Sequence, residues 1–208
     1  MLDVEAVPES ERSAATLALA HLSNLHNYVR DFEWALSLFE LCTEFKGVIK
    51  TDWSFVAARD GAMTVYHFAK TFEILNTYVA KSPSLKAGSD KVAIKRAGRT
   101  LREFFPQINV LRDTIAHDGE LKNTVEKAAW HPLKGPIRVG TLLVGNEAAQ
   151  IEIKAIAGDQ LVLTKAGALV GYRLNRAALE VLKQVAKEVS SAVRVRAPIH
   201  AASESDRD

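Results

Sequence analysis

Two long stretches of helical periodicity, residues 9–46 and 51–81, constrain the fold of this chain more than any other feature. In both stretches apolar side chains recur at steps of three and four residues, a spacing that places them on one face of an α-helix. Gly47 lies between the stretches and is a natural helix stop. The sequence therefore predicts a mainly α-helical protein that begins with two long helices.

The apolar steps also predict which side of each long helix is buried. In the first helix the expected core positions are Trp34, Leu38, Leu41 and Phe45. An interruption of this helix near Asn24–Asn27 is one alternative. In the second helix they are Trp53, Val56, Phe68, Phe72, Ile74, Leu75 and Tyr78. The expected N-caps are Ser10 for the first helix and Thr51 or Asp52 for the second.

Three polar side chains, Asp60, Thr64 and His67, fall on the apolar stripe of the second helix. Polar groups on a buried face must find hydrogen-bond partners. One interpretation is a satisfied internal network in which His67 bonds to Asp60 or to a backbone carbonyl. The other is that Asp60 and His67 form an auxiliary functional site.

Positive charge is concentrated in one part of a chain whose net charge is only +2. Residues 81–102 hold seven lysines and arginines but a single acid, Asp90. A loop at Ser82–Gly88 and a cap at Ser89 predict a helix over residues 90–105. Its expected apolar side consists of Ile94, Ala97, Leu101, Phe104 and Phe105. Its basic side is a row at steps of four, four and three residues, made of Lys91, Lys95, Arg99 and Arg102.

This basic row has two interpretations. Charged rows on helices are often solvated surfaces without a ligand. Like charges in one row also repel, however, by about a few tenths of a kcal/mol per pair, and an anion lying across them relieves that cost. Nucleic acid is the obvious candidate anion. The four side chains of the row are therefore predicted to bind RNA.

A short helix expected over residues 107–117 carries the chain's most specific chemical pattern. Its core face is expected to be Ile108, Leu111 and Ile115, and it also carries Arg112, Asp113 and His117. The arginine fork suits phosphate, and histidine transfers protons near neutral pH. In the catalytic hypothesis Arg112 holds a phosphate, His117 is the general acid or base, and Asp113 orients one of them. In the structural alternative Arg112 pairs with a carboxylate, and the helix dipole favours His117 at the C-terminal end.

The sequence RDTIAH at residues 112–117 resembles the R-x4-H signature of the HEPN superfamily, in which a polar residue often follows the arginine. The resemblance covers roughly residues 10–130. It implies an up-and-down helical bundle and, in many members, a metal-independent endoribonuclease whose two motifs meet in a homodimer. Other members are non-catalytic RNA-binding or protein-interaction modules. Many belong to bacterial toxin–antitoxin or phage-defence systems, so the implied partners are RNA, a second copy of the chain, and an antitoxin or other protein.

Helix geometry gives a separate reason to expect a dimer. Five steps of about 100° place Arg112 and His117 about 140° apart around the helix. One subunit is therefore not expected to form the site alone. A two-fold dimer would present each motif to the other.

After Pro132 the sequence changes character, with frequent glycines and short apolar runs. The runs at residues 137–144, 150–156, 160–164 and 168–172 predict an antiparallel β meander of three or four strands. Asn175 is expected to cap a closing helix over residues 176–192. The predicted division is a helical bundle over 1–132, the meander and closing helix over 133–193, and a disordered tail over 194–208.

Several classes of function are disfavoured by the sequence. Cys42 is the only cysteine, which excludes an internal disulfide or a cysteine zinc cluster, and we expect its thiol to be buried. The histidines are scattered without metal-ligand spacing, so no metal site or cofactor is predicted. The chain has no apolar run of the roughly 20 residues that a membrane span needs. We therefore expect a cytoplasmic protein.

Overall fold

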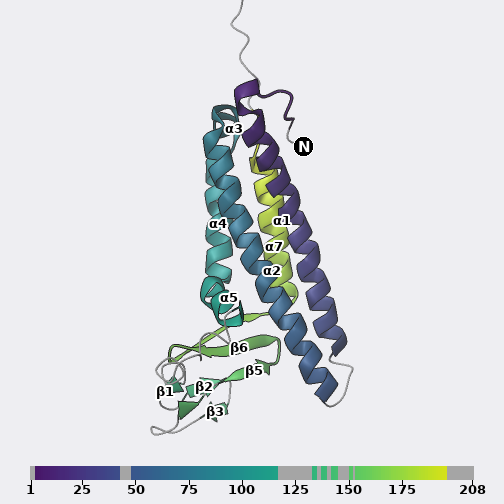
Figure 1. The fold of residues 1–208 in the computed structure, drawn as a ribbon, viewed down its shortest axis with the longest axis vertical. Coiled ribbons are helices and arrows are strands. Elements are labelled where there is room, and N and C mark those ends of the chain that lie inside the picture. The colour runs from purple at the N-terminus through teal and green to yellow at the C-terminus, as the bar shows by residue number, and fades with distance from the viewer. Residues whose placement is uncertain are drawn as a thin grey trace, which may run out of the picture.

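The computed structural model is mainly α-helical, with a small antiparallel sheet before the C-terminal helix, and this confirms the predicted fold class (Figure 1). The residues that it describes are 3–42, 48–116, 133–134, 137–139, 142–144, 150–151 and 153–195. None of the helices in these ranges is both long enough and apolar enough to cross a membrane.

The helices and strands follow the predicted order. The helices are α1 (Glu9–Cys42), α2 (Val48–Lys81), α3 (Pro83–Gly88), α4 (Lys91–Phe104), α5 (Ile108–Ala116) and α7 (Arg176–Ala192). The strands are β1 (Leu133–Lys134), β2 (Ile137–Val139), β3 (Leu142–Val144), β4 (Gln150–Ile151), β5 (Lys154–Ala157), β6 (Gln160–Lys165) and β7 (Ala168–Arg173).

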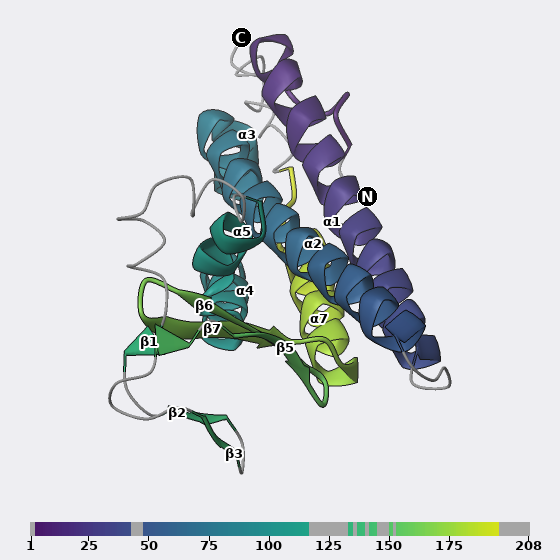
Figure 2. The same cartoon turned by 60° about the horizontal axis from the view of Figure 1, so that its bottom comes forward.

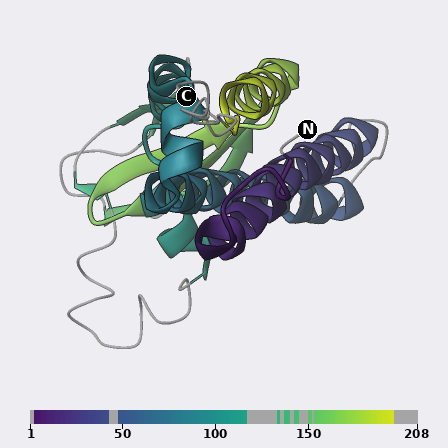
Figure 3. The ribbon, with the colours of Figure 1, turned by 90° about the horizontal axis from the view of Figure 1, so that it is seen from above.

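The four longest helices form a bundle. Helices α1 and α2 pack along their length as a hairpin, and α7 packs against both α1 and α4 (Figures 1 and 3). The backbone N–H of Asp90, at the start of α4, donates to the carbonyl of Ala192 at the end of α7, at 2.9 Å. Helix α7, which the chain reaches only after the sheet, therefore runs antiparallel to α4 and completes the bundle.

The core face predicted for α1 is wrong. Trp34 and Leu41 are 62% and 48% exposed, Leu38 is only partly buried, and Phe45 lies outside the described residues. The buried residues of α1 are Ala15, Ala18, Leu22, Leu25, Val29, Phe32, Ala35, Leu36, Phe39 and Cys42. This stripe extends along nearly the whole helix, whereas the predicted one covers only the C-terminal turns. The longer stripe faces the bundle because it buries more apolar surface.

The core face predicted for α2 is correct in part. Phe68, Phe72 and Leu75 are buried as expected, and Tyr78 is partly buried. The other three expected core side chains are half exposed: Trp53, Val56 and Ile74. Small side chains such as Ala57, Ala58 and Ala62 are buried instead. They allow the helices to approach closely, which the apolar spacing alone does not reveal. On α4, Phe104 is 38% exposed, while the other expected core positions are buried.

Several predicted helix boundaries also need correction. The segment Ser82–Gly88, expected to be a loop, contains α3, whose N-cap is Ser82 and whose first residue is Pro83. Helix α4 is capped by Asp90 rather than Ser89. Helices α1 and α2 begin before their expected caps, and α1 is continuous through Asn24–Asn27. The cap at Asn175 is confirmed, because its side chain accepts from the N–H of Ala178 at 2.9 Å.

The sheet β5–β6–β7 is antiparallel and lies across one end of the bundle, beside α5 and α2 (Figure 2). Strand β6 is its centre, and Leu161, Val162, Leu163 and Thr164 are all buried there. The run expected over 137–144 is a hairpin, in which Ile137 of β2 pairs with Val144 of β3. The run over 150–156 divides into β4, which pairs with β1, and β5.

Tyr172 of β7 fixes the sheet to α2. Its ring is buried, and its hydroxyl donates to the carbonyl of Ala58 at 2.5 Å. Burial and the nearby charge of Asp60 raise the pKa of Tyr172, so the hydroxyl keeps its proton. A Cβ atom at Gly61 would lie 2.5 Å from this hydroxyl oxygen and 3.0 Å from Cδ1 of Leu174. Glycine at position 61 is therefore what allows the sheet to approach the helix.

We predict that Gly61→Ala destabilises the protein although alanine favours helices. The helix gain is about 1 kcal/mol, and overpacking costs about 1–3 kcal/mol, so a net loss of up to about 2 kcal/mol is expected in urea unfolding. In the Tyr172→Phe background the clash with the hydroxyl disappears, and Gly61→Ala should cost less. A Gly61→Ala protein that is more stable than wild type would contradict this packing.

Candidate functional site

Helix α5, the helix of the R-x4-H pattern, is held between α2 and the sheet. Ile108, Leu111 and Ile115 are buried, as predicted, and Thr114 is buried with them. The Thr114 hydroxyl donates to the carbonyl of Val110 at 2.8 Å. Val110 and Asp113 are exposed on the outer side of the helix. The bundle and the sheet thus hold α5 in place while its polar side faces outward.

Arg112 lies at the edge of this outer side and contacts Asp113 and Tyr66. Its Nη1 donates to Oδ1 of Asp113 at 3.0 Å, and its guanidinium carbon lies 5.1 Å from the ring centroid of Tyr66 on α2. Asp113 also faces Lys165 of β6, with 3.9 Å between the charged atoms. Asp113 therefore lies between two cations, and Tyr66 supports the arginine through a cation–π contact. This geometry fits an oriented arginine, and it equally fits the structural salt bridge that the sequence left open.

His117 lies outside the described residues, so the structure does not place it relative to Arg112. Helix α5 is described as far as Ala116. The predicted pairing of Arg112 and His117 therefore stays a prediction.

The two predicted auxiliary residues do not lie on the buried stripe of α2: Asp60 and His67 are both exposed, and only Thr64 is buried. The His67 ring stacks on Tyr28 of α1, with 6.0 Å between the centroids, and meets Tyr66 edge-on at 5.4 Å. Tyr66 also contacts Arg112, so the rings of His67 and Tyr66 and the guanidinium of Arg112 form a continuous row of contacts. Asp60 forms no hydrogen bond or ion pair with any residue that the structure describes. Partial removal from water, with the charge of Asp31 as a smaller cause, raises the pKa of Asp60.

The basic row on α4 is exposed along its length. Lys91, Lys95, Arg99 and Arg102 all lie on the solvent side of the helix. Among the residues that the structure describes, none of the four forms an ion pair, whereas their neighbour Arg96 pairs with Glu188 of α7. The row covers about 16 Å, from eleven steps of 1.5 Å. Within the described part of the chain it is a strip of positive charge without ion-pair partners.

A cleft of about 260 Å³ lies beside the end of this row, between α2, α4 and α5. Arg102, Lys70, Glu73 and Asn109 contribute polar groups to it, and Lys70 pairs with Glu73 at 2.8 Å. Phe72 and Phe105 line it with aromatic side chains. The sequence did not predict this cleft, because one of its walls is α2, which is distant along the chain from α4 and α5.

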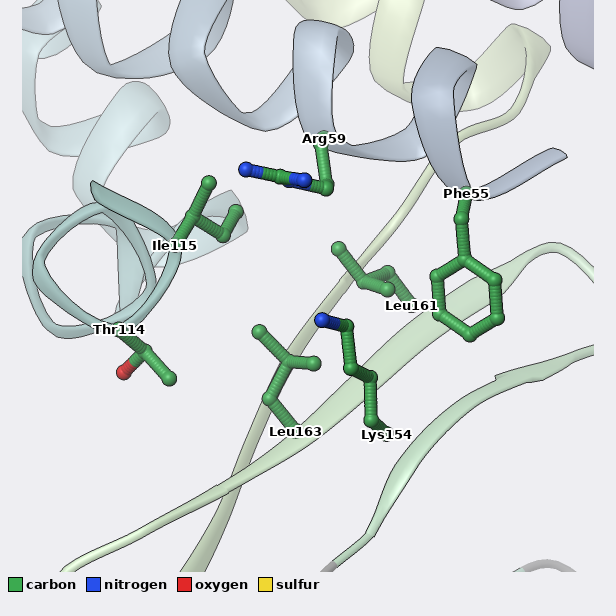
Figure 4. A pocket seen from close by; sticks show the side chains of 7 residues that line it. All are labelled: Phe55, Arg59, Thr114, Ile115, Lys154, Leu161 and Leu163. Atoms are coloured by element: carbon green, nitrogen blue, oxygen red, sulfur yellow. The ribbon is translucent and has the colours of Figure 1, made fainter. Parts of the chain in front are cut away.

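A second, small pocket lies between α2, α5 and the β5–β6 hairpin (Figure 4). Two cations line it, Arg59 of α2 and Lys154 of β5, which the sequence gave no reason to pair. The other lining residues are Phe55, Thr114, Ile115, Leu161 and Leu163. The docking of the sheet on α2 is what brings the two cations to one pocket.

Comparisons of this chain with protein-family models, curated proteins and solved structures find no match. The resemblance to HEPN proteins therefore remains a prediction from the residues alone. Within the described part of the chain, no cluster of three or more His, Cys, Asp or Glu side chains could hold a metal ion.

We predict that Asp60→Asn stabilises the protein at pH 7. Since the folded state raises the pKa of Asp60, it holds that proton more tightly than the unfolded state. Below the ordinary value of about 3.9 both states are protonated and no penalty exists. The penalty develops as pH rises through the window between that value and the raised folded-state pKa. Thermal unfolding should show a higher Tm for Asp60→Asn at pH 7 and no difference at pH 3.

The control for this measurement is Asp52→Asn, which removes an exposed carboxylate from the same helix. It should change the Tm little at either pH. A lower Tm for Asp60→Asn at pH 7 would mean that the carboxylate makes a stabilising contact, as the internal-network interpretation requires.

Proposed function

We propose that this protein binds RNA through the basic row of α4. The observation that carries the proposal is that four exposed cations in one row lack carboxylate partners among the described residues. Mutual repulsion disfavours such a row in the absence of an anion. The phosphates of a nucleic acid strand would neutralise it and release their bound counterions, which is the main source of sequence-independent affinity.

The neighbouring cleft supports single-stranded RNA as the ligand. Arg102 belongs both to the row and to the lining of the cleft, so a strand on the row would pass its mouth. Phe72 and Phe105 form part of the cleft wall, although both are packed into the core and are only 5% and 4% exposed. Proteins that bind single strands commonly combine a cationic track with aromatic contacts to bases.

A second candidate function is RNA cleavage without metal, and the setting of Arg112 favours it. Asp113 and Tyr66 fix the direction of the guanidinium, and Asp113 and Val110 are exposed beside it. An exposed apolar side chain next to a charged pair suits contact with a second copy of the chain. In the homodimer that we propose, Arg112 of one subunit and His117 of the other would share one phosphate.

The proposed chemistry would need no cofactor. His117 would accept the proton of a ribose 2′-hydroxyl as its oxygen attacks the adjacent phosphorus, and the bond to the 5′-oxygen would break. The departing oxygen would take a proton, and the products would be a cyclic phosphate and a 5′-hydroxyl end. Arg112 would stabilise the charge that builds up on the non-bridging oxygens. Asp113 would keep Arg112 in position.

We predict that Lys95→Gln/Arg99→Gln weakens RNA binding and its dependence on salt. Each lost phosphate contact should lower the slope of log K against log salt by about 0.7, so the double variant should lose about 1.4. Fluorescence anisotropy with a single-stranded oligonucleotide across a salt series would measure both effects. The matched control is Arg30→Gln/Lys187→Gln, which removes two exposed cations on α1 and α7. Equal losses in the two double variants, or a flat salt response of the wild type, would contradict the proposed surface.

For cleavage, we predict that wild-type protein cuts RNA in EDTA and that His117→Ala reduces the rate by about 10²–10⁴, the usual contribution of a general acid or base. The control is His26→Ala, which removes a histidine that bonds to Ser190 on another face. Mixing His117→Ala with Arg112→Ala should restore part of the activity if the site is shared between subunits. Cleavage that His117→Ala leaves unchanged would exclude this mechanism.

A further inference from the structure

The cleft between α2, α4 and α5 combines exposed polar groups of both charges with apolar lining. Lys70 and Glu73 line it from α2, and Arg102 and Asn109 line it from α4 and α5. All four of these side chains are exposed. Pockets for drug-sized ligands commonly measure about 300–1,000 Å³. A cleft of about 260 Å³ therefore suits one planar group of the size of a nucleobase, with the rest of the ligand outside.

Gly98 of α4 lies beneath the guanidinium of Arg102. A Cβ atom at Gly98 would lie 2.9 Å from Cε1 of Phe72 and 3.4 Å from Nη1 of Arg102. The arginine side chain thus folds back along its own helix, beside the Phe72 ring. Arg102 forms no hydrogen bond or ion pair with any residue that the structure describes. Its planar guanidinium is free to stack on a base or to bind the adjacent phosphate.

The Lys70–Glu73 pair presents hydrogen-bonding groups on the opposite wall. Nζ of Lys70 donates to Oε2 of Glu73 at 2.8 Å, whereas Oε1 of Glu73 accepts from no residue in the described part of the chain. An ammonium carries three N–H donors, so Lys70 keeps two for a ligand. The pair is half exposed, and such surface pairs contribute little to stability. Its position at the cleft is therefore better explained by a ligand than by folding.

The order of donors and acceptors selects guanine among the four bases. The Watson–Crick edge of guanine carries two adjacent N–H donors and then a carbonyl acceptor. A carboxylate can accept both donors at once, and a neighbouring ammonium can donate to the carbonyl. Adenine and cytosine would turn a ring nitrogen acceptor toward the carboxylate, and uracil has one N–H donor between two acceptors. A site built around such donors rejects bases that leave its polar groups unpaired.

We propose that this cleft binds a guanine base of the RNA. Glu73 accepts from the two N–H groups of the base, Lys70 donates to its carbonyl oxygen, and Arg102 holds the base or its phosphate. The inference rests on the proposed RNA binding, because the basic row leads a strand past the mouth of the cleft. It also extends that function, since a row of cations alone binds RNA without regard to sequence.

Fluorescence anisotropy with uridine oligonucleotides that carry one central guanosine, inosine, adenosine or cytidine tests the preference. The guanosine strand should bind about tenfold more tightly than the adenosine strand, the scale of one bidentate base contact. Inosine lacks the exocyclic amino group of guanine, so its strand should bind with intermediate affinity. Glu73→Gln should remove most of the preference for guanosine. The matched control is Glu180→Gln, because Glu180 forms the same kind of pair with Lys183 on α7, at 3.4 Å. It should keep the full preference.

Titration with guanosine 5′-monophosphate and adenosine 5′-monophosphate separates the cleft from the basic row. If all strands bind with a steep salt dependence but without preference, and the two mononucleotides bind equally, the guanine site is overturned and the row is not. If no strand binds, the row is contradicted, and a guanosine preference among the mononucleotides that Glu73→Gln abolishes still supports the cleft. A preference that Glu73→Gln retains, or that Glu180→Gln also removes, overturns the proposal. Circular dichroism establishes that both variants are folded.

Discussion

The contact between Tyr172 and α2 at Gly61 determines where the β-rich segment lies. The tyrosine is buried, donates to a helix carbonyl, and occupies space that any side chain at position 61 would take. The sheet is thereby placed against α2 and α5 together. Its strands bring Lys165 to Asp113 and Lys154 to the pocket of Arg59. Both the surroundings of the R-x4-H helix and the pocket lined by Arg59 and Lys154 depend on this one packing arrangement.

The bundle separates two kinds of charged surface. On α4 the buried side is made of small and aliphatic residues, and the opposite side carries a row of cations without partners in the described structure. Some cations on other helices are paired, as in Arg176 with Glu40 and Lys183 with Glu33. Paired charges hold helices together, whereas an unpaired row is available to a ligand. This contrast is why the proposed RNA surface is placed on α4 rather than on another helix.

Features that depend on residues close together in the sequence could be predicted. Features that depend on contacts between distant residues could not. Helix periodicity and the cap at Asn175 are local, so the order of elements and the start of α7 were predictable. The choice of buried face on α1 depends on what the neighbouring helices offer, and Trp34 and Leu41 were assigned to the core wrongly. Arg59 and Lys154 meet only because the sheet docks on α2. No local pattern could have paired two residues so distant along the chain.

Hydrogen–deuterium exchange with and without a single-stranded RNA tests the central claim most directly, since it locates the contact surface without any substitution. We predict that RNA slows the exchange of backbone amides over residues 91–109, the span of α4 and the adjoining cleft. The outer surface of α1 around Arg30 and Trp34 should be unaffected. Protection confined to α1, or no protection at RNA concentrations that saturate binding, would contradict the claim that α4 is the RNA-binding surface.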